Sequence, residues 1–195
     1  MVSVFDLPAT VENAPAFADR RPCAFWIGNT DRHPVRSEMA RAHADNPKIR
    51  FVPMYWHGGV PTPFKTMREH CEYKYLMDIQ GTGWSGRLKH LMLLGSVVLI
   101  FDRDLHEYWE DQFVPWVHYV PVKADGSDLQ QRVDFLDANP DRAAEMARVC
   151  NARARDVFSK PAVHEYYASV IRKLTWPCCD TRPLRHADAV ACRGG

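Results

Sequence analysis

The stretch from residue 73 to residue 101 constrains the fold more than any other part of the chain. YKYLMDI (73–79) is a mainly apolar run that predicts a strand, and SVVLIF (96–101) is a continuous β-branched run, typical of a strand that is buried on both faces of a sheet. Between them, apolar residues recur at helical spacing and predict an amphipathic helix over 85–94: Leu88, Leu91, Met92 and Leu94. A strand, a helix and a second strand in this order form a parallel crossover unit. The unit predicts an α/β fold, Rossmann-like, with a mainly parallel sheet and helices on both faces.

The rest of the chain continues this alternation. Further strands are predicted over 22–28 and 48–54, and a third apolar stretch covers 117–122. Helical segments are predicted over 34–44, 64–71, 128–138, 140–157 and 161–174. HGGVPTPF (57–64) is predicted to be a loop because it is rich in glycine and proline. We therefore expect one domain over 22–176, after an irregular lead-in over 1–21 and before an irregular tail over 177–195.

Some of these helices carry start signals. Pro34 and Pro140 suit the first turn of a helix, where a missing N–H costs nothing. Asn139 is expected to cap the helix that Pro140 opens. Ser127-Asp128-Leu129-Gln130 matches a capping box, which predicts a helix start there as well.

Charge and composition exclude several classes of function. The net charge is +1 and the basic residues are dispersed, so no nucleic-acid partner is expected. No apolar run approaches the roughly twenty residues that a membrane span needs. The N-terminal sequence MVSVFDLPATVENAPAF lacks the basic start and apolar core of a signal peptide, so a cytoplasmic location is the default expectation.

Cysteine and histidine spacing predicts no metal site. The nine histidines form neither H-x-x-x-H nor H-E-x-x-H, and the cysteines form no C-x-x-C pair. We expect the cysteines to be free thiols, most of them buried: Cys23, Cys71, Cys150, Cys178, Cys179 and Cys192.

GTGWSG (81–86) is the motif most suggestive of a ligand. It matches G-x-G-x-x-G and lies between the predicted strand 73–79 and the helix that follows. Glycines let a phosphate approach the backbone, and N–H groups at a helix start are unpaired. The turn therefore predicts an anion site, whichever ligand brings the anion.

Three chemistries fit such a turn to different degrees. An NAD site would find its ribose-binding acid in Asp102, but Trp84 is bulky beside a pyrophosphate and the motif lies in mid-chain. A serine hydrolase would use Ser85 as nucleophile, but G-x-S-x-G requires glycine at position 87, where this chain has Arg87.

The third chemistry is a nucleotide-sugar site, in which Arg87 itself has a role. Its guanidinium can pair with phosphate oxygens in bidentate fashion. When a sugar is transferred from such a donor, negative charge builds on the departing diphosphate. A fixed cation then stabilises the transition state more than the ground state.

Longer stretches of the sequence resemble a known family. HCEYKYLMDIQGTGWSGRLKHLMLLGSVVLI, followed by PWVHYVPVKADGSDLQQRVDFL, resembles glycosyltransferase family 90, and PCAFWIGNTDRHPVR resembles that family's upstream strand and glycine turn. The family holds capsule-associated and lipopolysaccharide-modifying transferases and the Rumi-like protein O-glucosyltransferases and O-xylosyltransferases. The resemblance runs from about Cys23 to Trp176.

The resemblance implies a fold, a reaction and a set of site residues. It implies the C-terminal, donor-binding domain of a GT-B enzyme that transfers a sugar from a donor such as UDP-glucose or UDP-xylose, with inversion and without a metal or other cofactor. The acceptor would be a hydroxyl of a glycan or a protein. His118, close to the donor cleft in such folds, is expected to be structural. The expected substrate-binding residues are Gly28, Arg36, Thr82, Gly83, Ser85, Gly86 and Arg87.

Two departures from the family pattern affect the expected activity. Family members commonly have arginine or lysine just before the upstream glycine, where this chain has Ile27, and Arg32 or Arg36 is the candidate replacement. The family's general base belongs to an N-terminal half that this sequence does not match, so no base is assigned, and a further chain supplying that half is an expected partner. Asp31, Asp102 and Asp104 are acids near strand ends but are expected to be surface residues. The alternatives are a truncated, non-catalytic nucleotide-sugar-binding remnant and, behind it, an NAD-dependent oxidoreductase.

Overall fold

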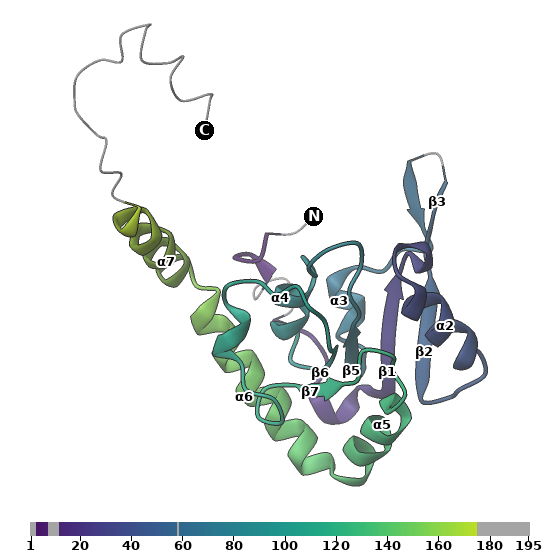
Figure 1. The fold of residues 1–195 in the computed structure, drawn as a ribbon. Coiled ribbons are helices and arrows are strands. Elements are labelled where there is room, and N and C mark those ends of the chain that lie inside the picture. The colour runs from purple at the N-terminus through teal and green to yellow at the C-terminus, as the bar shows by residue number, and fades with distance from the viewer. Residues whose placement is uncertain (1–2, 8–11, 58, 175–195) are drawn as a thin grey trace, which may run out of the picture. The chain divides into compact units, whose positions relative to one another are not determined.

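The computed structural model describes residues 3–7, 12–57 and 59–174 (Figure 1). The chain divides into two compact units, residues 1–160 and residues 161–195. Nearly all of the second unit's described part is helix α7 (Lys160–Lys173). The predicted tail, 177–195, lies outside the described residues. All other elements belong to the first unit.

A five-stranded sheet forms the centre of the first unit. Its strands are β1 (Arg21–Gly28), β2 (Ile49–Pro53), β5 (Tyr73–Asp78), β6 (Val97–Phe101) and β7 (Val120–Val122). They lie in the order β2-β1-β5-β6-β7, and every neighbouring pair is parallel. The predicted α/β class with a mainly parallel sheet is confirmed.

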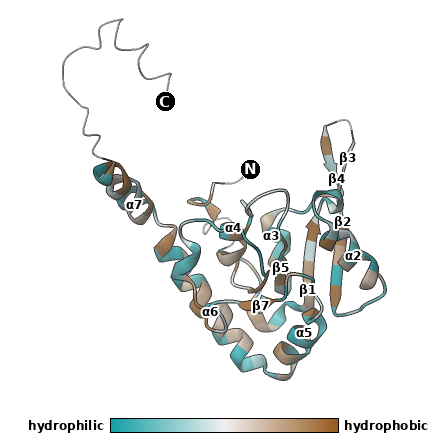
Figure 2. Ribbon diagram, in the orientation of Figure 1, coloured by the Kyte–Doolittle hydropathy of each residue, from teal (hydrophilic) through white to brown (hydrophobic). Residues whose placement is uncertain are grey.

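Helices cover both faces of this sheet. α2 (Pro34–Ala42) and α5 (Leu129–Ala138) pack on one face, α3 (Met67–His70) and α4 (Leu88–Met92) pack on the other, and α6 (Pro140–Val157) contributes to both cores. Residues of β6 alternate between the two cores, with Val97 and Leu99 on one side and Val98 on the other. Because both faces are buried, the strands carry mainly hydrophobic residues, whereas the helices mix both kinds (Figure 2).

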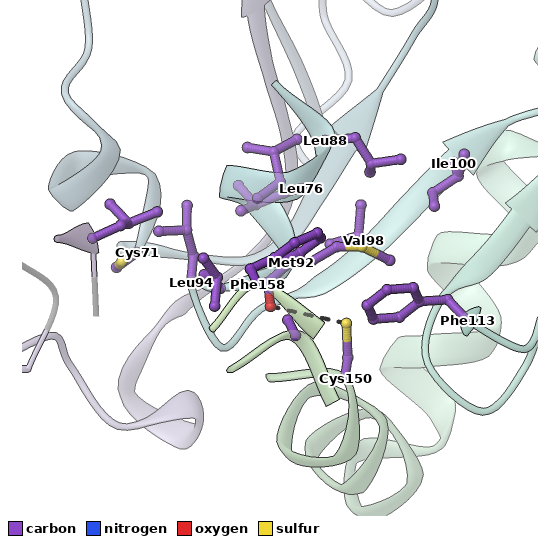
Figure 3. Close-up of a cluster of buried hydrophobic side chains, with 14 of the residues drawn as sticks. Cys71, Leu76, Leu88, Met92, Leu94, Val98, Ile100, Phe113, Cys150 and Phe158 are labelled. Carbon is purple, nitrogen blue, oxygen red and sulfur yellow. Dashed lines mark hydrogen bonds between the residues drawn. The ribbon is translucent and has the colours of Figure 1, made fainter. Parts of the chain in front are cut away.

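The core on the α4 face brings distant parts of the chain together. In Figure 3 the thiol of Cys150, from α6, points toward Met92 of α4, whose carbonyl oxygen lies 3.9 Å from the sulfur. Burial raises the pKa of Cys150 to about 12. The three cysteines within the described part of the chain, Cys23, Cys71 and Cys150, are free thiols as predicted. Cys178, Cys179 and Cys192 lie outside that part.

The structure corrects three local predictions. Part of the predicted loop 57–64 belongs to an antiparallel hairpin of β3 (Tyr55–His57) and β4 (Val60–Thr62), in which Gly59 takes a φ of 82° that glycine adopts at little cost. The capping box expected at Ser127 is absent, because Asp128 is the N-cap of α5 and its side chain makes no cap bond. Asn139 precedes α6 as predicted, but its amide donates backward to the Phe135 carbonyl instead of capping.

Candidate anion site at the carboxyl edge of the sheet

The strand order places a topological switch point between β1 and β5. From β1 the chain first adds β2 on one side and later adds β5, β6 and β7 in succession on the other. The connections that leave the carboxyl ends of β1 and β5 therefore diverge. In open parallel sheets, ligands bind outside the carboxyl ends of the strands at such a point. Both predicted glycine turns begin here, one at Gly28 and the other after Asp78.

A buried tryptophan lies beneath this edge. The ring of Trp26 is 1% exposed, and two guanidinium groups stack on it. Their carbon atoms lie 5.2 Å (Arg36) and 5.8 Å (Arg87) from the ring centroid. A Cβ atom on Gly28 would lie only 2.7 Å from the same ring, so the absence of a side chain there lets Trp26 occupy its place. Cation–π attraction helps to hold both arginines at the switch point.

Arg36 ties the two diverging loops together. It extends from the first turn of α2 and donates to the Asn29 carbonyl at 3.0 Å, after β1. It also donates to the carbonyls of Ile79, at 2.7 Å, and Gln80, at 2.9 Å, after β5. Burial, and then the nearby charge of Arg87, lower the pKa of Arg36 to about 10. The group therefore stays charged at neutral pH.

Arg87 bridges the same two strands from the other loop. It donates to the Ile27 carbonyl at 2.6 Å through Nη1. Its Nη2 makes only long contacts, 3.5 Å to the Met77 carbonyl oxygen and 3.8 Å to a carboxylate oxygen of Asp78. Burial lowers the pKa of Arg87, and the charge of Asp78 opposes that change. The side chain as a whole is 23% exposed.

Asp78 is the centre of a buried polar network. Its Oδ1 accepts the Ser85 hydroxyl at 2.6 Å, and its Oδ2 accepts from Arg103 at 3.0 Å. Arg103 in turn donates to Oε2 of Glu110 at 2.8 Å. Nδ1 of His106 lies 3.0 Å from the same carboxylate oxygen. The side chains of Asp78 and Arg103 are fully buried. This network joins the loops that follow β5 and β6.

The hydrogen bonds and ion pairs described above bring together more guanidinium groups than carboxylates. Three guanidinium groups (Arg36, Arg87 and Arg103) face two carboxylates (Asp78 and Glu110) in the arrangement above. Because Asp78 shares its charge with Arg103, it neutralises Arg87 only in part. Arg36 and Arg87 are thus a partly buried pair of cations whose charge the buried carboxylates balance only in part, an arrangement suited to binding an anion.

The glycine loop stands beside these cations. Thr82 and Gly86 are exposed and Gly83 is half-buried. A Cβ atom added to Gly83 or Gly86 would meet nothing within 4 Å, and neither residue has a positive φ. The protein's own packing therefore does not require glycine at these two positions, which leaves room for a ligand against the backbone.

The predicted helix start at residue 85 is wrong. α4 begins at Leu88, has five residues, and follows Arg87 with no side-chain cap. The Ser85 hydroxyl is held by Asp78, so this part of the chain is anchored to β5 before the helix begins. So short a helix offers little macrodipole, so the positive charge beside this loop comes from side chains.

The other residues that the sequence analysis named lie in the core, in a local hydrogen bond or at the surface. Ile27 points into the apolar core, 6% exposed, so a cation at this position would be buried here. His118 accepts a hydrogen bond from the Val114 N–H at 2.8 Å, a structural contact. Asp31, Asp102 and Asp104 are all exposed. Asp102 and Asp104 border a cavity of about 170 Å³ whose wall also includes His33 and Arg103.

Sequence reasoning missed Trp26, Asp78, Arg103 and Glu110. A signal existed for Asp78, which is the acid at the end of a predicted strand, and for Arg103, which closely follows another. Nothing in the sequence pattern indicates that both meet in one buried network, because 25 positions separate them.

Two features are absent from the residues that the structure describes. These residues contain no group of three or more histidine, cysteine, aspartate or glutamate side chains placed to hold a metal ion. None of their helices is both long and apolar enough to cross a bilayer.

The relatives found by sequence are protein O-glucosyltransferases. Protein O-glucosyltransferase 1 of Rattus norvegicus is 46% identical over 80 residues, which cover 41% of this chain and 20% of that protein. Protein O-glucosyltransferase 3 of Homo sapiens is 34% identical over 167 residues, which cover 82% of this chain and 33% of that protein. The chain thus spans between a fifth and a third of the length of these relatives.

A solved structure and a family model complete the comparison. Sucrose-phosphate synthase from Thermosynechococcus elongatus aligns over 76% of this chain and 37% of its own, with 12% identity and a TM-score of 0.48, a likeness too low to carry an argument. The family model described as glycosyl transferase family 90 matches residues 6–189. Because that match covers most of the sequence, the chain belongs to glycosyl transferase family 90.

Proposed function

We propose that this chain binds the donor in the transfer of a hexose or pentose from a UDP-sugar to a hydroxyl of a glycan or a protein, with inversion at the sugar carbon. The observation that carries the proposal is the pair of arginines, Arg36 and Arg87, stacked on Trp26 at the switch point of the sheet. The names of the relatives favour glucose as the sugar.

The geometry gives the two arginines different parts in this reaction. All three donor nitrogens of Arg36 bond to backbone carbonyls, so Arg36 organises the loops and contributes its charge. Arg87 keeps Nη1 on the Ile27 carbonyl and can turn Nη2 to the diphosphate, since its present contacts there are long. Charge grows on the diphosphate as the glycosidic bond breaks, and a preplaced cation then lowers the barrier. The guanidinium groups take the place of a metal ion, and no cofactor enters the proposal.

The acceptor hydroxyl must lose its proton as it attacks. Asp31, Asp102 and Asp104 are exposed carboxylates at this edge, and no contact in the structure sets one of them apart as a base. We propose that the base comes from the N-terminal half of the fold, supplied by a further segment or by a partner chain. Activity is then expected only when both parts are present.

Titration calorimetry with UDP tests donor binding. Arg87→Ala should weaken UDP binding at least about tenfold, because a hydrogen bond to a charged group contributes roughly 1.5–3 kcal/mol. Arg148→Ala is the matched control, since Arg148 is an exposed arginine on α6 that pairs with Glu145. Equal affinity of wild type and Arg87→Ala for UDP would refute the site.

Two further measurements separate the alternatives. Release of UDP from UDP-glucose in the presence of an acceptor distinguishes an enzyme from a binding remnant, which would hold UDP without turnover. Titration with NADH, followed by its fluorescence, addresses the oxidoreductase. Saturable NADH binding without UDP binding would overturn the proposed function.

A further inference from the structure

Ser85 lies in the glycine loop but faces away from the open side of it. Its side chain is 8% exposed, and its hydroxyl donates to the carboxylate of Asp78 at 2.6 Å. Asp78 ends β5 and is itself 0% exposed. The bond therefore joins the second half of the loop to the end of a central strand.

A serine hydroxyl has a single proton to donate. In this structure that proton goes to Asp78, and the hydroxyl would present only lone pairs to a phosphate. Lone pairs repel an anion, so a donor role toward the diphosphate would require the bond to a buried carboxylate to break. Charge-assisted bonds of this length are among the stronger hydrogen bonds in proteins.

The bond between Ser85 and Asp78 lies next to Arg87. Arg87 follows two residues later, and its Nη2 lies 3.8 Å from the same carboxylate oxygen that accepts the Ser85 hydroxyl. The other oxygen of Asp78 is held by Arg103 at 3.0 Å, which fixes the carboxylate in place. One buried acid thus orients both the loop and the cation that the loop carries.

We propose that Ser85 and Asp78 are positioning residues, a latch that holds the loop 81–87 with Arg87 aimed at the ligand, and that Ser85 does not bond to the ligand. The identity of the ligand in this inference rests on the proposed function, whereas the hydrogen bond that holds the loop does not depend on it. The loop would be ordered before the donor arrives, so binding would lose less conformational freedom.

Substitutions of Ser85 test the hydroxyl. Ser85→Ala should weaken UDP binding about tenfold, the size expected for a lost hydrogen bond to a charged group. Ser85→Thr keeps the hydroxyl and should stay within about twofold of wild type. Ser37→Ala is the matched control, because the Ser37 hydroxyl bonds to the Pro34 carbonyl of its own helix and should leave UDP binding unchanged.

A double-mutant cycle with Asp78→Ala separates a latch from a direct ligand contact. An alanine at this position has no polar side-chain atom, so the Ser85 hydroxyl loses its partner on β5. With a latch, Ser85→Ala should cost less than about twofold in UDP affinity once Asp78 is replaced, because the two changes act through one bond. A direct contact would give the same loss in both backgrounds, and that result would overturn the proposal.

Hydrogen exchange without nucleotide covers the case in which Asp78→Ala does not fold or UDP does not bind. Amides of residues 81–87 should exchange about tenfold faster in Ser85→Ala than in wild type, with Ser85→Thr at the wild-type rate. Unchanged exchange in Ser85→Ala would refute the latch. Failure of UDP to bind the wild type would refute the proposed function alone.

Discussion

Substituting alanine at Gly28 tests how Trp26 organises the carboxyl edge. The new Cβ atom would lie 2.7 Å and 3.0 Å from two carbon atoms of the indole ring. The ring is fully packed and has a guanidinium from Arg36 and another from Arg87 against it, so it cannot move without displacing a cation. Overpacking of this kind costs about 1–3 kcal/mol.

Thermal unfolding gives the size of the effect. In a domain of this length, 1 kcal/mol corresponds to a change of roughly 2–4 °C in Tm, so a cost of about 1–3 kcal/mol should make Gly28→Ala melt about 2–12 °C below wild type. Gly86→Ala is the matched control, since its Cβ would meet no atom within 4 Å, and it should keep the wild-type Tm or exceed it slightly. A wild-type Tm for Gly28→Ala together with a lowered Tm for Gly86→Ala would refute the reasoning.

Two further predictions concern buried titratable groups. Burial lowers the pKa of His70 from 6.5 to about 4, so the unfolded chain binds the proton more readily and stability should fall as the pH drops from 6.5 toward 4. Urea unfolding at pH 7 and pH 5 should show a loss about 2 kcal/mol larger in wild type than in His70→Gln; equal losses would contradict this assignment. Burial raises the pKa of Cys150 to about 12, so iodoacetamide at pH 8 should alkylate it in the native protein far more slowly than the half-buried Cys23. Peptide mass spectrometry reads both rates, and equal labelling would show that the core around Cys150 opens freely.

The regular parts of the fold could be predicted from the sequence because their signals are local. SVVLIF is a strand buried on both faces and became β6, and Pro34 and Pro140 open α2 and α6 as their fixed φ predicts. The hairpin β3–β4 was missed because strands of three residues, one of them containing a proline, carry little periodic signal.

The site was predictable only in outline. The resemblance pointed to Arg36 and Arg87, and the structure brings both to one ring at the switch point. The start of α4 was misplaced because its apolar spacing begins at Leu88 and does not fix where the helix starts, whereas in the structure the preceding Ser85 is bonded to Asp78. Such a bond depends on the positions of two chain segments in space, which helical periodicity does not encode.

The central claim is that Arg87 binds the diphosphate of a nucleotide, and the ratio of affinities for UDP and UMP measures it most directly. In wild type, UDP should bind at least about tenfold more tightly than UMP, because the second phosphate gains the Arg87 contact. In Arg87→Ala the ratio should fall to between one and about twofold, while Arg148→Ala keeps the wild-type ratio. A ratio that is the same in wild type and in Arg87→Ala would contradict the account.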